Sequence, residues 1–243
     1  MKLKNKICLI TGSSRGIGKF IAKAFSKEGG KVIITYRNNH KAARATAKEI
    51  NSKDIFKLDV SKKISVQSVF KKIKKKYGRI DVLVNNAGVN KTNDFDKLSE
   101  KDWDFVMETN LKGVFFCCQE VLKYMPNEGK IINIGSLSGE YGGPRTPSYA
   151  AAKAGVMALT HCLARFVGRK KINVNCLSPG IIAGEFTEKT MSKSVKKIIK
   201  NLLLIPRPGK YNDLVGAAVF LASKEASYIT GQTISVNGGA WVR

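Results

Sequence analysis

The sequence is poor in the residue types that metal sites, membrane spans and secreted disulfide frameworks require. Its 243 residues include two histidines, His40 and His161, and five cysteines without a C-x-x-C pair. These spacings argue against a metal site and a disulfide framework. All five cysteines lie among apolar residues, so buried free thiols in a reducing compartment, the cytoplasm, are expected. No apolar run approaches about 18 residues, so no membrane span is expected.

Acidic residues are also scarce. Lys and Arg number 43 against 18 Asp and Glu, which gives a formal net charge of +25. Such a charge could attract nucleic acid, a membrane surface or an acidic protein. However, no nucleic-acid motif accompanies it, and the densest lysine run, residues 71–76, alternates with apolar residues as on an amphipathic helix. We therefore favour lysines scattered over solvated helix faces, and we do not expect a nucleic-acid partner.

A glycine-rich turn follows a short apolar run at residues 7–11 and precedes a helical pattern. Its spacing is G-x-x-x-G-x-G, between residues 12 and 18. Glycines let the backbone approach a phosphate closely, and a helix N-terminus offers free N–H groups and a favourable dipole. The turn therefore indicates nucleotide binding, although a turn that serves only tight packing has the same pattern.

The second apolar run, residues 31–37, bears on the choice of nucleotide. It ends in Tyr36 and Arg37, where an acidic residue would hold the ribose 2′-hydroxyl of NAD(H). Arg15 lies in the first turn. Two guanidinium groups and no carboxylate favour the 2′-phosphate of NADP(H).

Short apolar strands and amphipathic helices alternate along the rest of the chain. Strands are expected at 55–58, 80–84, 130–134, 172–177 and 233–236, and helices at about 41–50, 62–77, 99–125, around Tyr149, and 211–222. This alternation predicts an α/β fold with one doubly wound parallel sheet of the Rossmann type and helices on both faces. Ligands bind such sheets beyond the carboxyl ends of the strands.

No repeat, low-complexity tract or linker divides the chain, so residues 1–243 are expected to form a single domain. The irregular segment at about 181–209 lies between proline breakers at the ligand end of the sheet. We expect it to form a small substrate lid, the alternative being a surface excursion without consequence.

Tyr149 and Lys153 are the strongest candidates for chemistry. They lie four residues apart in an alanine-rich helical segment, and residues at that spacing share one helix face. A nearby ammonium favours the ionised form of a phenol, which prepares it to pass a proton. On its own, however, Tyr-x-x-x-Lys is usually only the wet face of an amphipathic helix.

Taken in order, these features make the chain similar to the short-chain dehydrogenase/reductase family over essentially its whole length. The matching pieces are Thr11-Gly12-x-x-x-Gly16-x-Gly18, Asp59, Asn85-Asn86-Ala87-Gly88, Asn110, Ser136, Tyr149, Lys153 and Pro179-Gly180. The resemblance implies that Tyr149 exchanges a proton with the substrate oxygen and that Ser136 polarises this oxygen. It implies that Lys153 assists the tyrosine and binds the nicotinamide ribose, and that Asn110 connects Lys153 to solvent through a water.

The resemblance also assigns two sets of binding residues. The expected cofactor-binding residues are Gly12, Ser14, Arg15, Gly16, Ile17, Gly18, Arg37, Asp59, Val60, Asn86, Ala87, Gly88, Tyr149, Lys153, Pro179, Gly180 and Ile182. The expected substrate-binding residues are Ser136, Ser138 and Tyr149.

Within the family, the segments INIGSLSG, YAAAKAGV, VNCLSPG and ASYITGQTISVNGG are most similar to the 3-oxoacyl-[acyl-carrier-protein] reductases. This implies NADPH-dependent reduction of a ketone, a 3-oxoacyl thioester of fatty-acid synthesis, by a homotetramer that meets an acidic carrier protein. Arg169 and Lys170 are expected near the active-site rim to meet that carrier. Three positions depart from the pattern, with Gly184 for a threonine, Asn127 for an arginine and Phe166 for a glutamate.

Two other functions remain open. Members of the family that act on sugars or other small polar alcohols share the catalytic residues, and Glu185, Thr187 and Glu188 in the expected lid could bind hydroxyl groups. A nucleotide-binding protein without catalysis is the other alternative. The presence of all four catalytic residues argues against it, but fold-level analogy cannot exclude it.

Overall fold

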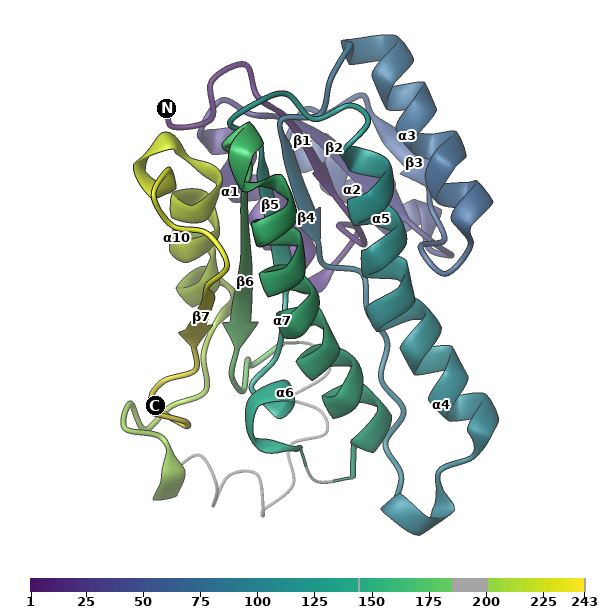
Figure 1. Ribbon diagram of the computed structural model, residues 1–243, viewed down its shortest axis with the longest axis vertical. Helices are drawn as coiled ribbons and strands as arrows, with labels where there is room; N and C mark the ends of the chain where they lie inside the picture. Colours follow the sequence, from purple (N-terminus) through teal and green to yellow (C-terminus); the bar gives the residue numbers. More distant parts are fainter. Residues whose placement is uncertain (144, 185–200, 243) are drawn as a thin grey trace.

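The computed structural model describes residues 1–143, 145–184 and 201–242. Seven parallel strands form one sheet in the order β3-β2-β1-β4-β5-β6-β7 (Figure 1). The strands are β1 (Ile7–Ile10), β2 (Lys31–Tyr36), β3 (Ile55–Lys57), β4 (Val82–Asn85), β5 (Lys130–Ile134), β6 (Asn173–Pro179) and β7 (Thr233–Val236). The strand order reverses between β1 and β4, as in a doubly wound sheet. The predicted fold class is confirmed.

Helices cover both faces of this sheet. They are α1 (Gly16–Lys27), α2 (His40–Glu49), α3 (Lys63–Tyr77), α4 (Glu100–Met107), α5 (Gly113–Val121), α6 (Ser138–Tyr141), α7 (Pro147–Val167) and α10 (Tyr211–Ala222). One core cluster joins the sheet to α3, α5 and α7 through residues such as Phe70 and Val156. The other joins it to α1, α2 and α10 through residues such as Phe25 and Leu221. Burial on both faces explains why the central strands β1 and β4 are almost entirely apolar rather than alternating.

The helical stretch expected at 99–125 is interrupted. A π-helical turn, Glu108–Lys112, separates α4 from α5. A π turn inserts one extra residue into a helix and is frequent at functional sites, but the apolar periodicity of the sequence does not reveal it. Residues 80 and 81, expected in a strand, instead precede β4, and the short helix α6 was not predicted.

The carboxyl ends of the strands lie at the lower edge of the sheet in Figure 1, and the N-terminus lies at the upper edge. Helix α7 runs back from the lower edge to the upper one. Its 21 residues span about 30 Å at 1.5 Å per residue. Tyr149 therefore lies at the carboxyl edge, and the 3₁₀ turn Gly168–Lys170 that follows α7 lies at the opposite edge.

The placement of Arg169 and Lys170 near the active-site rim is therefore wrong within this chain. Both lie in the turn that leads into the amino end of β6. The carbonyl of Lys170 accepts a hydrogen bond from the Glu128 N–H at 3.3 Å, in the turn that leads into β5. Asn127 lies in the same turn. A helix between two parallel strands must run antiparallel to them, so its two ends belong to opposite edges.

Only the two ends of the expected lid lie within the described residues. Ile182 forms an isolated parallel bridge with Gly209. The Ala183 N–H donates to the Gly209 carbonyl at 2.7 Å, and the Gly209 N–H donates to the Ile181 carbonyl at 2.8 Å. Residues 185–200, which include Glu185, Thr187 and Glu188, lie outside the described residues, so the lid stays a prediction.

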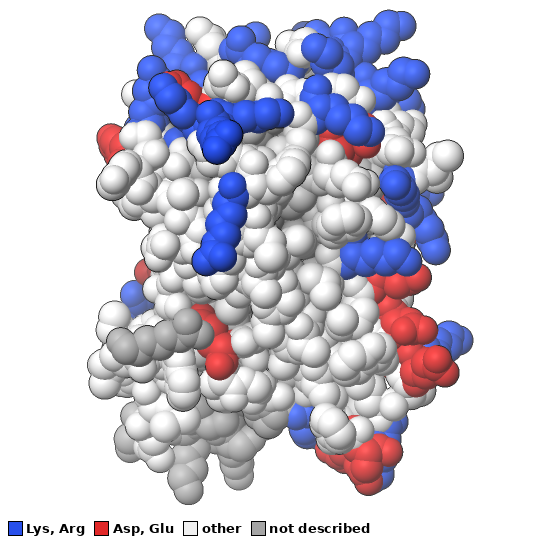
Figure 2. Space-filling model, viewed as in Figure 1, with Lys and Arg blue, Asp and Glu red and all other residues white. Residues whose placement is uncertain are grey.

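The basic residues are unevenly distributed over the face shown in Figure 2. Lys and Arg gather at the top, toward the amino ends of the strands, while acidic residues gather lower, over α4. The expectation of lysines scattered over helix faces therefore misses this concentration at one edge.

The structure also bears on two expectations from composition, namely buried free cysteines and the absence of a membrane span. Cys8, Cys117, Cys118 and Cys176 are buried and free, as expected, but Cys162 on α7 is exposed. Among the described helices, none is long and apolar enough to cross a membrane.

Candidate active site

A cavity of about 470 Å³ opens at the carboxyl edge, where β1 to β4 end. Ten of the expected cofactor-binding residues line it: Gly12, Ser14, Arg15, Gly16, Arg37, Asp59, Val60, Asn86, Ala87 and Gly88. Tyr36, Asn38, Asn39, Leu58, Val89 and Thr109 complete the lining. The structure thus brings together residues from five separate segments of the chain at the switch point of the sheet, where doubly wound folds bind their ligands.

The glycines of the first turn have two different tasks. A Cβ on Gly12 would lie 2.9 Å from the Ala87 Cα, and one on Gly18 would lie 2.8 Å from the Gly12 carbonyl oxygen. These two glycines serve close backbone packing. Gly16 has φ +57°, and the nearest atom to a Cβ there would be the Tyr211 hydroxyl oxygen at 3.9 Å. Gly16 therefore leaves open space at the start of α1.

This open space fits a phosphate group. Helix α1 begins at Gly16, and its N-cap residue, Arg15, makes no side-chain hydrogen bond to the first turn. The first N–H groups of a helix lack partners within the helix and attract anions. The residues present therefore fit the pyrophosphate of a dinucleotide.

Buried hydroxyl groups hold the glycine turn against the end of β4. Thr11 is 1% exposed, and its Oγ1 accepts hydrogen bonds from the N–H groups of Asn86 at 2.9 Å and Ala87 at 3.0 Å. In return, Asn86 Nδ2 donates to the carbonyls of Thr11 at 2.9 Å and Gly12 at 3.1 Å. The Asn86 side chain thus positions the turn as well as lining the cavity.

Thr35 and Ser13 extend this network, and neither was predicted to act at the site. Thr35 Oγ1 accepts from the Gly12 N–H and donates to the Ile10 carbonyl, both at 3.0 Å. Ser13 Oγ accepts from the Thr35 N–H at 3.0 Å. The available signal is a threonine that directly follows the apolar residues Val32, Ile33 and Ile34, because a buried hydroxyl needs a partner.

Arg37, expected to help select NADP(H), and Asp59, expected to bind the cofactor, both line this cavity. Arg37 follows β2, and its guanidinium lies over the ring of Phe105, 5.4 Å from the ring centroid. Phe105 on α4 was not predicted, since nothing in the local sequence indicates that it reaches Arg37. Asp59 Oδ1 accepts from the N–H and hydroxyl of Ser61 at 3.0 and 2.8 Å, which fixes its carboxylate at the cavity edge.

Tyr149 and Lys153 lie together on α7, as the spacing predicts. Lys153 is 4% exposed. Its Nζ donates to the carbonyl of Ile134 at 2.6 Å and lies 5.6 Å from the centroid of the Tyr149 ring. The ammonium is therefore held between the tyrosine and the end of β5. Because this lysine is buried and fixed in place, the pair is not the wet helix face of the alternative interpretation.

Ser136 follows β5, two residues beyond Ile134. Its Oγ accepts a hydrogen bond from the Ser138 N–H at 3.1 Å, so the two expected substrate-binding serines are joined. Gly139 allows α6 to approach α7, since a Cβ there would lie 2.8 Å from the Lys153 carbonyl carbon.

Glu140 fixes α6 to the sheet and was missed by sequence reasoning. Its Oε1 accepts hydrogen bonds from the hydroxyls of Ser178 at 2.5 Å and Ser235 at 3.0 Å. The two serines belong to β6 and β7, so a single carboxylate holds the substrate end of α6 against both strands.

Asn110 lies in the π turn and is fully buried. Its Oδ1 accepts from the Val89 N–H at 2.8 Å, and its Nδ2 donates to the Val89 carbonyl at 2.7 Å. The side-chain amide therefore binds the segment that follows Gly88 rather than pointing at Lys153. A proton relay through this position would need a main-chain group of the π turn.

The segment after β6 explains one departure from the expected pattern. Pro179 ends β6, and its carbonyl accepts from the Leu137 N–H at 2.9 Å. A Cβ on Gly180 would lie 2.6 Å from the Asn237 Cα. A Cβ on Gly184 would overlap the hydroxyl of Tyr211 and lie 2.6 Å from its Cζ. A threonine at position 184 would therefore require the Tyr211 ring to move.

Comparison with known proteins agrees with this geometry. A family model described as enoyl-(acyl carrier protein) reductase matches residues 12–240. The chain is 40% identical over 244 residues to a 3-oxoacyl-[acyl-carrier-protein] reductase of Staphylococcus epidermidis, covering 98% of this chain and 100% of the relative. It is 39% identical over 244 residues to the enzyme of the same name from Thermotoga maritima, with 98% and 99% covered.

A solved structure is similar over almost the whole fold. A doubly substituted variant of a Serratia marcescens short-chain dehydrogenase/reductase superposes with a TM-score of 0.94 at 31% identity, covering 99% of both chains. The chain belongs to the short-chain dehydrogenase/reductase family. It is accordingly an oxidoreductase that uses a nicotinamide cofactor.

Proposed function

We propose that this protein reduces 3-oxoacyl thioesters carried by an acyl-carrier protein to secondary alcohols, with NADPH as the reductant, in fatty-acid synthesis. The observation that carries the proposal is the buried Lys153 ammonium held between the Tyr149 ring and the end of β5. The names of the Staphylococcus and Thermotoga relatives support the thioester substrate.

Each catalytic residue has one task in this proposal. The cofactor supplies the hydride that reduces the carbonyl carbon. The Tyr149 hydroxyl donates the proton to the carbonyl oxygen, and the Lys153 ammonium stabilises the phenolate that remains. The Ser136 hydroxyl donates a hydrogen bond to the same oxygen and orients it. The Asn110 side chain holds the segment after Gly88. A main-chain group of the π turn around Asn110 would take part in the proton relay that reprotonates Tyr149.

The cofactor assignment rests on charge at the cavity. Arg15 and Arg37 both line it, and guanidinium groups suit the 2′-phosphate of NADPH, which a carboxylate at the end of β2 would repel. Val60, Ile17, Pro179, Gly180 and Ile182 would complete the dinucleotide site. Residues 1–243 would act as one domain, in the reducing environment of the cytoplasm that five free cysteines suit.

A homotetramer is part of the same proposal. An open groove of about 650 Å³ has the π turn and α5 on one side and α7 on the other. Leu111, Phe115 and Leu159 are among its lining residues. Phe115 is 43% exposed, and Phe166, which stands where a glutamate was expected, is 79% exposed. Exposed aromatic side chains beside an open groove suit a surface that another subunit would cover. Light scattering of the purified protein measures the subunit count.

A substrate panel with NADPH and NADH side by side tests the function. We expect NADPH oxidation with an acetoacetyl thioester, slower oxidation of NADH, and no reduction of NADP(+) by polyols. Turnover of polyols alone would replace the fatty-acid assignment with a dehydrogenase of small polar alcohols. NADPH binding without turnover of any substrate would favour a non-catalytic nucleotide-binding protein.

A further inference from the structure

A cavity near the amino ends of the strands has no part in the proposed reaction. It has a volume of about 890 Å³, and its lining comes from the N-terminal segment, the starts of β4, β5 and β6, and the turns around residues 168–173 and 222–230. These segments lie at the edge of the sheet opposite the Tyr149 site (Figure 1). The basic residues in Figure 2 gather toward the same edge.

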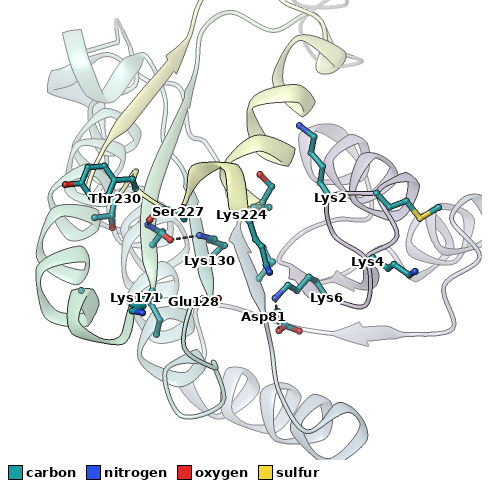
Figure 3. Close-up of a pocket in the computed structure, with 18 residues that line it drawn as sticks. Lys2, Lys4, Lys6, Asp81, Glu128, Lys130, Lys171, Lys224, Ser227 and Thr230 are labelled. Atoms are coloured by element: carbon teal, nitrogen blue, oxygen red, sulfur yellow. Dashed lines mark hydrogen bonds and ion pairs between the residues drawn. The ribbon is translucent and has the colours of Figure 1, made fainter.

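Lysines dominate the charge of this cavity (Figure 3). The six lysines that line it are Lys2, Lys4, Lys6, Lys130, Lys171 and Lys224, and the lining acids are Asp81 and Glu128. Among the described residues, only two of the six form an ion pair with a carboxylate. Lys2 pairs with Glu225 at 2.5 Å, and Lys6 pairs with Asp81 at 3.7 Å. Like charges therefore face one another across the cavity without a matching number of anions.

The buried member of this set is Lys130, the first residue of β5. It is 6% exposed, and its Nζ donates to Asn173 Oδ1 at 2.5 Å (Figure 3). Both hydrogens of Asn173 Nδ2 are used, by the carbonyls of Ser227 and Ile229 at 3.0 Å, so its oxygen is fixed toward the ammonium. A neutral amide satisfies one N–H of Lys130 but does not neutralise its charge.

The electrostatic cost of this arrangement lowers the pKa of Lys130. Burial lowers the pKa of its ammonium, Glu128 opposes this shift, and Lys6 adds to it. Asp81, the other acid of the lining, is already engaged by the Ile7 N–H at 2.8 Å and by Arg79 at 3.1 Å. An anion bound in the cavity would offset the cost of gathering these lysines.

Three residues at the rim have left-handed backbone conformations without being glycine. Asn5, between Lys4 and Lys6, has φ 62°, Glu128 has φ 65° and Lys171 has φ 56°. Such conformations cost roughly 1–2 kcal/mol for residues such as Glu128 and Lys171, whereas asparagine tolerates them. The surrounding structure therefore holds the rim of the cavity in one shape.

We propose that this cavity binds a phosphorylated small molecule of nucleotide size. Ammonium groups on several segments suit the dispersed charge of a phosphate chain, and no arginine lines the cavity within the described residues. The volume exceeds the need of a single phosphate. Val82, Ile172 and Ala222 add apolar lining, and Tyr228 at the rim is fully exposed, so its ring is available for stacking on an aromatic base.

Titration calorimetry with adenosine diphosphate and with inorganic pyrophosphate tests the proposal, in about 0.15 M salt so that long-range charge effects are screened. We expect saturable binding of adenosine diphosphate, and at least about fivefold weaker binding of pyrophosphate. Tyr228→Ala should remove this difference. Equal affinity for the two probes in the unsubstituted protein would overturn the aromatic part of the proposal.

Matched variants locate the binding. Lys171→Gln/Lys224→Gln removes two exposed lysines of the cavity and should weaken adenosine diphosphate binding at least about tenfold. Lys72→Gln/Lys75→Gln on α3 removes the same charge elsewhere and should change it less than about twofold. Lys130→Met removes the buried positive charge at the floor of the cavity. The Lys171→Gln/Lys224→Gln variant changes only exposed residues, so the test does not depend on whether Lys130→Met folds.

Three results would overturn the assignment of this site. The first is the absence of saturable binding of either probe. The second is an equal loss in the cavity variant and the α3 variant, which would mean attraction by net charge alone. The third is loss of adenosine diphosphate binding in Arg37→Asp with no loss in the cavity variant, which would place the nucleotide in the cofactor cavity. None of these results depends on turnover of a thioester, so the proposed activity is tested separately.

Discussion

Replacing Thr11 by valine would test whether buried hydroxyl groups hold the cofactor turn. The substitution keeps the shape of the side chain but removes the oxygen that accepts hydrogen bonds from the Asn86 and Ala87 N–H groups at 2.9 and 3.0 Å. A buried donor left without a partner costs about 1–3 kcal/mol. Because both main-chain groups belong to partly buried residues, we expect a loss of roughly 2–4 kcal/mol in the free energy of unfolding.

Urea unfolding at neutral pH measures this loss, with Thr11→Ser as the matched control. Serine retains the hydroxyl and removes one methyl group, so its expected cost is about 1 kcal/mol. NADPH affinity should fall in Thr11→Val and stay close to normal in Thr11→Ser, because the hydroxyl positions Gly12. A loss below about 0.5 kcal/mol in Thr11→Val would refute the reasoning, since two partly buried donors left without a partner should cost more than that.

Arg37→Asp should weaken NADPH binding by about 10- to 100-fold and leave NADH binding nearly unchanged in fluorescence titrations, and equal effects would overturn the NADP(H) assignment. Burial raises the pKa of Cys176 to about 11, so a thiol reagent at about pH 8 should leave Cys176 unmodified until urea unfolds the chain. The Cys176 thiol ionises near pH 9.0 in the unfolded chain but only near pH 11 in the folded one, so the free energy of unfolding should fall as the pH rises between these values. In urea unfolding, Cys176→Ala should make this fall less steep. Gly184→Thr should lower the free energy of unfolding by about 1–3 kcal/mol, because the threonine overlaps the Tyr211 ring. In a chain that also carries Tyr211→Ala, the same threonine should lower it by less. Additive effects of the two changes would contradict this contact.

The parts of the fold that sequence predicted are those with a local physical signal. Apolar runs bounded by glycine and proline located the strands, and alternation with amphipathic helices implied a parallel sheet. The helix at 211–222 and the strand at 233–236 have the bounds that were expected. The spacing of Tyr149 and Lys153 predicted a shared face, and the structure places both at one site.

The features that sequence missed depend on contacts between distant segments. The π turn around Asn110 adds one residue to a helix without changing its composition. Glu140 acts through hydrogen bonds to serines of β6 and β7, which no local pattern reveals, and the threonine in the apolar run around Thr35 does not indicate which groups its hydroxyl binds. Arg169 was expected near the active-site rim because of the family resemblance, which takes no account of the 21 residues of α7 that carry it to the opposite edge of the sheet.

The role of Tyr149 is tested most directly by Tyr149→Phe, which removes only the phenolic oxygen. With NADPH and an acetoacetyl thioester, we expect kcat to fall by about 10²- to 10⁴-fold, the usual contribution of a positioned acid. NADPH affinity should stay within about threefold of that of the unsubstituted protein, since the ring and Lys153 remain. A variant that retained more than about a tenth of the original kcat would contradict the account, because proton transfer would then not pass through this hydroxyl.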